Sequence, residues 1–175
     1  KEDSFKDCLN IIEIKLSQGV SSINNNAFSG CENLSSVEIP ASLTHIGDSA
    51  FERCVSLCSI VIPDGVNFVG ESAFISCVTL KKINIPTNLE IIGEKGFYRC
   101  TALENINLPD TVTSLGDYAF GSCRSFESIT LPNKLTTISK GLFTDCVDLK
   151  SVTLPDNITS IEEKAKLLKE YGIAG

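Results

Sequence analysis

A cysteine recurs every 23 residues along this chain of 175 residues. Each of the seven cysteines in the series follows a phenylalanine by three positions. The pairs are Phe5/Cys8, Phe28/Cys31, Phe51/Cys54, Phe74/Cys77, Phe97/Cys100, Phe120/Cys123 and Phe143/Cys146. Self-similarity at a fixed short period is typical of a solenoid, in which each unit contacts only its neighbours. We therefore predict a stack of seven 23-residue coils, which presents extended surfaces rather than one deep cleft.

Positions within a unit can be counted from its cysteine. Apolar, mostly β-branched residues at plus six and plus eight, with a polar residue between them, predict a short, half-buried strand. All six prolines stand at plus nine, where the missing N–H ends a parallel ladder. Apolar residues at plus twelve and plus fifteen predict a second extended stretch. Each unit is therefore expected to contain two extended segments joined by a proline corner.

The segment around each phenylalanine has a different spacing. Its Ala-Phe-x-x-Cys pattern, with a large apolar residue three positions further on, predicts a short helical turn. Asp48, Glu71, Glu94 and Asp117 stand just before this segment, where a negative charge favours the start of a helix. We prefer this interpretation of the acidic residues to a cation site.

The complete unit reads L-x-x-I-x-I-P-x-x-L-x-x-I-G-x-x-A-F-x-x-C, and residues 80–100 are its clearest copy. This pattern resembles the leucine-rich repeat family in its BspA-like branch, from Phe5 to about Ala165. The resemblance implies an α/β solenoid. In it, a right-handed superhelix carries a parallel β-sheet on its concave side and short helical turns on its convex side. Such relatives occur on the surfaces of host-associated bacteria and protists, where they are linked to adhesion. The resemblance thus implies a cell-surface or secreted location.

The period stops after Ile161. We predict that residues 1–165 form the repeat domain and that residues 166–175 form a C-terminal cap. Helix formers with apolar residues at three-residue steps predict that the helix of this cap begins near Glu162. The chain opens at Lys1 inside a unit, without a signal segment or a run of about 20 apolar residues. We interpret it as a piece of a longer or processed protein.

Residues for catalysis are scarce. The sole histidine, His45, has no nucleophile placed beside it by the repeat, and no phosphate-binding or HExxH motif occurs. The repeat cysteines come one per coil without histidine partners, so we expect no metal and no cofactor. Their apolar register predicts buried, reduced thiols, whereas Cys58 falls on a polar register and is expected to be exposed. We expect this protein not to be an enzyme.

The net charge of −7 argues against a nucleic-acid backbone or an anionic membrane as the main partner. The remaining candidate is the outward side of the first strand, at plus five and plus seven. Its residues in successive units are Ser36, Glu38, Ser59, Val61, Lys82, Asn84, Asn105, Asn107, Ser128 and Thr130. They are mostly hydroxyls and amides, and we predict that they form a protein-binding concave face. A solvated sheet face without a partner is the alternative interpretation.

A second candidate lies at the edge of the stack. His45, Phe68 and Ile91 share one register position in successive units, and this apolar strip could be a contact patch or could pack inside the fold. Asn33 and Asn157 match the N-glycosylation pattern, which matters only in a eukaryotic secretory protein.

Three functions remain open at this stage. The first is a non-enzymatic, adhesin-like module that recognises extracellular-matrix or host-cell surface proteins. The second is a structural spacer of a larger surface protein. The third is an intracellular interaction scaffold, which reduced cysteines would suit.

Overall fold

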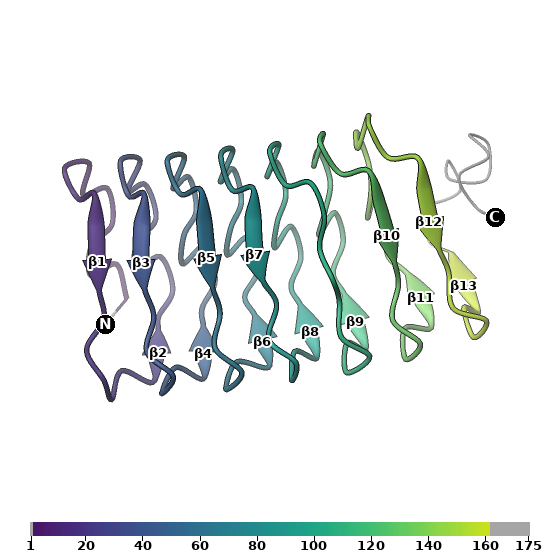
Figure 1. Ribbon diagram of the computed structural model, residues 1–175, viewed down its shortest axis with the longest axis horizontal. Coiled ribbons are helices and arrows are strands. Elements are labelled where there is room, and N and C mark those ends of the chain that lie inside the picture. Colours follow the sequence, from purple (N-terminus) through teal and green to yellow (C-terminus); the bar gives the residue numbers. More distant parts are fainter. Residues whose placement is uncertain (1, 162–175) are drawn as a thin grey trace.

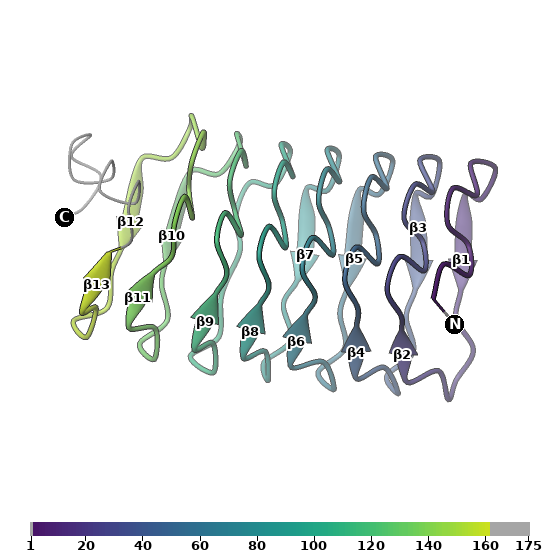
Figure 2. The same cartoon turned by 180° about the vertical axis from the view of Figure 1, so that it is seen from behind.

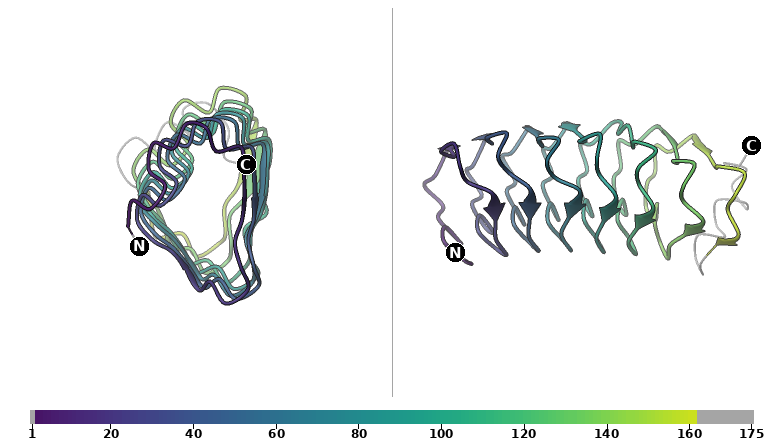
Figure 3. Two further views of the ribbon diagram at one scale, coloured as in Figure 1. Left: turned by 90° about the vertical axis from the view of Figure 1, so that its left-hand side faces the viewer. Right: turned by 90° about the horizontal axis from the view of Figure 1, so that it is seen from below.

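Two rows of short parallel strands form the framework of the computed structural model, which describes residues 2–161 (Figures 1 and 2). The first strand row contains β1 (Glu13–Lys15), β3 (Ser36–Glu38), β5 (Ser59–Val61), β7 (Lys82–Asn84), β10 (Ser128–Thr130) and β12 (Ser151–Thr153). The second strand row contains β2 (Ser22–Ile23), β4 (His45–Ile46), β6 (Phe68–Val69), β8 (Ile91–Ile92), β9 (Ser114–Leu115), β11 (Thr137–Ile138) and β13 (Ser160–Ile161). Seen along the stack, successive coils superpose into one closed outline (Figure 3). The described residues are therefore a β-solenoid.

The pairing register repeats the period of the sequence. Ile14 lies opposite Val37, and Ile60 lies opposite Ile83, each partner being 23 residues further along the chain. These central residues point inward while their two neighbours in each strand are exposed, as in a half-buried strand. The two extended segments per unit that the sequence predicts are confirmed.

The first strand row is not continuous, unlike the predicted sheet. It consists of three separate pairs, β1 with β3, β5 with β7, and β10 with β12. Residues 105–107 of the fifth unit form no strand. Asn105 and Asn107 flank Ile106 there, and asparagine is depleted in strands. In the views of Figures 1 and 3 the stack bends little, so this row presents a nearly flat face rather than the concave one that we predicted.

The predicted helical turns are wrong: residues 2–161 contain no helix. In each unit the Ala-Phe segment lies between two residues with positive φ, for example Ser49 (52°) and Arg53 (57°). Backbone in the left-handed region cannot continue a right-handed helix. The N–H groups donate to the next coil instead, as in Phe51 N to the Ala73 oxygen at 2.8 Å and Arg53 N to the Ile75 oxygen at 2.8 Å. The apolar spacing of a helical turn is thus produced here by consecutive tight turns.

The acidic residues ahead of this segment do not begin a helix either. The Asp48 carboxylate accepts a hydrogen bond from the Glu71 N–H at 2.8 Å, one coil further on. The Asp117 carboxylate does the same for the Lys140 N–H at 3.1 Å. These side chains therefore accept hydrogen bonds from backbone N–H groups of the next coil. The sequence had predicted that their negative charge would favour the start of a helix.

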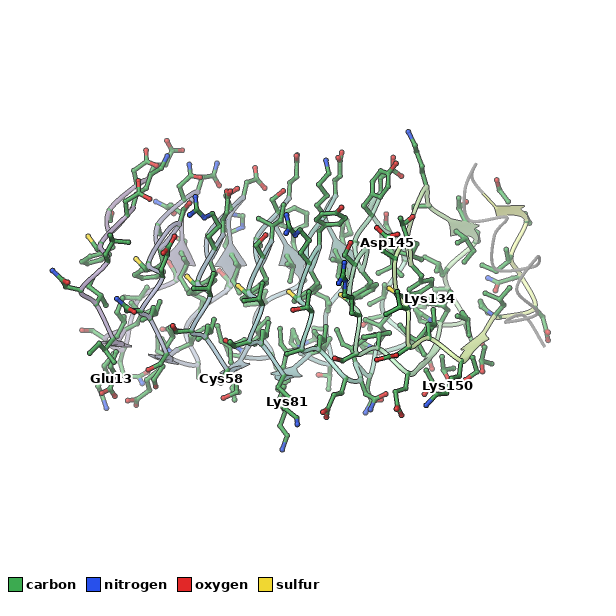
Figure 4. The ribbon with its side chains drawn as sticks, turned by 90° about the horizontal axis from the view of Figure 1, so that it is seen from above. Glu13, Cys58, Lys81, Lys134, Asp145 and Lys150 are labelled. Carbon is green, nitrogen blue, oxygen red and sulfur yellow. The ribbon has the colours of Figure 1, made fainter. Side chains whose placement is uncertain are left out.

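Phenylalanine rings stack through the centre of the solenoid. Phe51, Phe74 and Phe97 are fully buried, and the centroids of consecutive rings lie 5.2 Å apart. Beside them, each repeat cysteine from Cys31 to Cys146 donates its thiol to the carbonyl oxygen of the phenylalanine 26 residues before it, with Sγ–O distances of 3.0–3.2 Å. The sulfurs therefore form a row along the stack (Figure 4). All eight cysteines are free thiols.

The proline corner is confirmed as a tight turn. The carbonyl oxygen of each proline accepts a hydrogen bond from the N–H three residues later, as in Pro86 and Leu89 at 3.1 Å. The described coils end at Ile161, so the predicted cap at 166–175 and its helix from Glu162 lie outside the described residues. No helix within residues 2–161 is long and apolar enough to span a lipid bilayer.

Candidate binding surfaces

The outward side chains of the first strand row lie where the sequence placed them. All ten predicted residues are exposed, because alternate residues of a strand point to opposite faces and the intervening ones enter the core. We call the surface that these ten residues form the strand face. They are Ser36, Glu38, Ser59, Val61, Lys82, Asn84, Asn105, Asn107, Ser128 and Thr130.

Charged pairs lie along the strand face and its border. Lys15 Nζ lies 2.7 Å from a Glu38 carboxylate oxygen, and this hydrogen bond and charge raise the pKa of the Lys15 ammonium. Lys81 pairs with Glu104 at 2.8 Å in the same coil-to-coil manner. Because these pairs are solvent-exposed, each adds little stability, but together they cancel much of the local charge.

A crevice opens in the strand face where the strand row is interrupted. It has a volume of about 270 Å³ and lies between residues 105–110 and residues 128–133. Asn105, Asn107, Ser128 and Thr130 line it, so four of the ten predicted residues meet in one hollow. The backbone N–H groups of residues 105–107 donate to no other backbone group within the described chain. The crevice offers amide and hydroxyl side chains for hydrogen bonding.

Val61 is the apolar member of the strand face and is 66% exposed. Cys58, three residues before it, is exposed as predicted and lies away from the row of buried sulfurs (Figure 4). This part of the strand face can make apolar contact, although it carries no aromatic ring.

We call the strip formed by His45, Phe68 and Ile91 the edge patch, and it lies on the second strand row. His45 is exposed on β4, its ring stacks on Phe68 with centroids 6.2 Å apart, and Phe68 lies opposite Ile91 on β8. Phe68 is half-buried and Ile91 is 37% exposed, so the edge patch is partly packed inside the fold and partly accessible to a partner.

Beside the edge patch runs a broad, open groove that sequence reasoning missed. It has a volume of about 630 Å³ and spans the second to the fifth units. Its lining residues are Thr44, His45, Asp64, Gly65, Asn67, Asn88, Glu90 and Thr111. The sequence signal was present in Gly65, which replaces the side chains found at the same position in the adjacent units, Ser42 and Asn88.

Potential metal ligands are dispersed over residues 2–161. Three potential metal ligands do not gather anywhere in that range. His45 stacks on Phe68 rather than on a nucleophile. Burial raises the pKa of the Cys77 thiol to about 12 and that of Cys146 to about 12, which keeps these sulfurs protonated and unreactive near neutral pH.

Comparison with known proteins decides the family. The model of the BspA-type leucine-rich repeat region matches residues 1–95 and 67–166, with six copies of the repeat. This chain belongs to the BspA-type leucine-rich repeat family. A search of the curated proteins finds no match.

Solved structures of bacterial leucine-rich repeat proteins are similar to this chain. A leucine-rich repeat protein of T. pallidum is 28% identical with a TM-score of 0.62, over 91% of this chain and 64% of its own. A leucine-rich cell surface protein of Faecalibacterium prausnitzii is 26% identical with a TM-score of 0.59, over 93% of this chain and 52% of its own. A leucine-rich repeat protein of Bacteroides ovatus is 26% identical with a TM-score of 0.62, over 92% and 57%. The chain therefore spans less than two thirds of the length of each of these relatives.

Proposed function

We propose that this solenoid is a non-enzymatic protein-binding module of a bacterial surface protein, and that the strand face is its recognition surface. The observation that carries the proposal is the alignment of ten exposed, mostly short side chains in register along successive coils. A partner lying along the stack can contact several coils at once. The family and the cell-surface relative support this class of function.

The chemistry of the strand face indicates how binding would occur. Hydroxyl and amide groups form hydrogen bonds, and Lys82 and Glu38 are the charged members. The crevice between the fifth and sixth units brings four of the ten residues into one hollow, so we place the centre of the contact there. Without an aromatic anchor, the affinity should be modest and spread over many residues.

We further propose that the partners are extracellular-matrix or host-cell surface proteins and that the protein resides at the cell surface. Surface plasmon resonance with immobilised fibronectin, laminin and collagen tests the partner class. Asn107→Arg and Ser59→Arg should each reduce the binding signal at least tenfold without lowering the melting temperature, because the long side chain obstructs the face.

The control for these variants is Ser76→Arg. Ser76 lies on the opposite, turn-forming part of the coil, at the register where the chain already carries Arg53 and Arg99. It adds the same charge without touching the strand face, so binding should persist. Equal loss in all three variants would point to charge alone. Binding to none of the three proteins would favour a structural spacer or an intracellular interaction scaffold.

A further inference from the structure

The groove along the second strand row has the chemistry of a carbohydrate site. We propose that it binds a neutral oligosaccharide. This site is separate from the strand face, so the inference does not depend on the proposed function. It uses the eight lining residues described above, on the second to fifth units.

The polar groups of the groove are open and varied. His45, Asn67 and Glu90 are exposed, and their side chains make no hydrogen bond to any other described residue. Carboxylate and imidazole groups accept hydrogen bonds, and an amide both donates and accepts. Sugar hydroxyls also donate and accept, so each can pair with two such groups at once.

The fold holds other lining groups in place before any ligand arrives. One oxygen of Asp64 accepts hydrogen bonds from the Thr87 N–H at 2.9 Å and hydroxyl at 3.1 Å. The Asn88 amide donates to the Asp64 carbonyl oxygen at 3.1 Å. The second Asp64 oxygen and the Asn88 amide oxygen make no hydrogen bond within the described chain. Preorganised acceptors of this kind reduce the ordering cost of binding.

An aromatic surface adjoins these polar groups. His45 lines the groove at its second-unit end, and Phe68 of the next coil covers one face of its ring at an interplanar angle of 14°, which leaves the opposite face for a sugar ring. The weakly positive C–H groups of a sugar ring pack favourably on the face of an aromatic ring. Gly65 also lines the groove, where a Cβ would come within 2.7 Å of the Leu43 carbonyl oxygen of the preceding coil.

The shape and charge of the groove narrow the ligand class. It runs along the stack over four units, or about 14 Å at the usual strand spacing, which suits a chain of several sugar residues. Asp64 and Glu90 are its charged residues, and no lysine or arginine lines it. Acidic polysaccharides would therefore be repelled, whereas neutral ones would not.

The test is a titration of the ¹⁵N-labelled full chain with maltohexaose, cellohexaose and mannohexaose, each at millimolar concentration. We expect at least one of them to shift the amide signals of His45, Gly65, Asn67 and Glu90, while those of residues 105–107 stay unchanged. His45→Ser, Asn67→Thr and Glu90→Thr introduce residues that the solenoid already uses at these registers, namely Ser22 and Thr113. Each should weaken binding about tenfold, the usual loss for one good hydrogen bond.

Asp156→Asn is the control for the loss of a surface carboxylate in Glu90→Thr, because Asp156 is exposed in the last unit, away from the groove. It should bind as the unchanged chain does. The proposal is overturned if no sugar shifts the groove amides, or if the His45→Ser, Asn67→Thr and Glu90→Thr variants all bind as well as the control. It is also overturned if a lysine-rich peptide shifts these amides and no sugar does, since the groove would then select basic peptides.

Discussion

At the scale of single residues, the eight cysteines divide by environment rather than by sequence motif. Desolvation is the main cause that raises the pKa of the repeat cysteines from Cys31 to Cys146, and for Cys77 it does so to about 12. Their thiols also donate to phenylalanine carbonyls, which satisfies them inside the core. Cys58 is exposed and Cys8 is half-buried. A thiol must be accessible and ionised to react, so reactivity should follow this division.

We predict that Cys58 is alkylated first by iodoacetamide at pH 8, that Cys8 follows, and that Cys54 to Cys123 react only on unfolding. Mass spectrometry of peptides from a timed reaction measures the order. Cys58→Ser should remove the fast phase and leave the slow one intact. A fast phase on Cys77 in the folded chain would contradict the buried row.

At the scale of elements, the phenylalanine rings of the stack share one register but differ in how deeply they are buried. Phe74 is fully buried between two rings at 5.2 Å, whereas Phe5 is 43% exposed at the first coil. Because Phe74 and Phe5 are the same residue type at the same register, comparing them isolates what burial contributes to the free energy of unfolding.

We predict that Phe74→Ala lowers the free energy of unfolding by about 3–5 kcal/mol, the cost of truncating a buried ring. Phe5→Ala should cost less than half as much, because much of the Phe5 ring already contacts water. Urea denaturation followed by circular dichroism measures both. Similar losses for the two variants would show that the first coil is covered in solution.

The interruption at residues 105–107 gives a second prediction at this scale. Asn105→Ser with Asn107→Thr reproduces the residues of β10 in the next unit, Ser128 and Thr130. Better strand formers should close the row, slow the hydrogen exchange of the Ile106 amide at least tenfold, and narrow the crevice. If the crevice is the centre of partner binding, affinity should fall as protection rises. Unchanged exchange would mean that the asparagines do not cause the interruption.

At the scale of the whole molecule, the buried thiols make stability depend on alkaline pH. Burial raises the folded-state pKa of six repeat cysteines, Cys31, Cys54, Cys77, Cys100, Cys123 and Cys146. An unfolded thiol ionises near pH 9, while the folded one stays protonated. The stabilisation is therefore complete below about pH 8.5 and is lost as the pH rises toward the folded-state pKa.

We predict that the free energy of unfolding falls steeply between about pH 9 and pH 11, with each such cysteine contributing up to about 1.4 kcal/mol per pH unit. Urea titrations at several pH values measure the slope. Cys77→Ala should make the fall in the free energy of unfolding less steep by the contribution of one cysteine, even though it lowers stability at neutral pH. An identical slope in both chains would show that Cys77 ionises equally in the folded and unfolded states.

The period of 23 residues determined the solenoid, the family, the inward row of phenylalanine and cysteine, and the exposed strand face. This is because equivalent residues of a stacked repeat must share one environment. Only the tertiary structure decided how the turns are built, since left-handed residues such as Ser49 and Arg53 carry no reliable sequence mark. It also decided where the strand row breaks and where a groove opens. Those features depend on contacts between coils, such as that of Asp64 with Thr87, and not on any one unit.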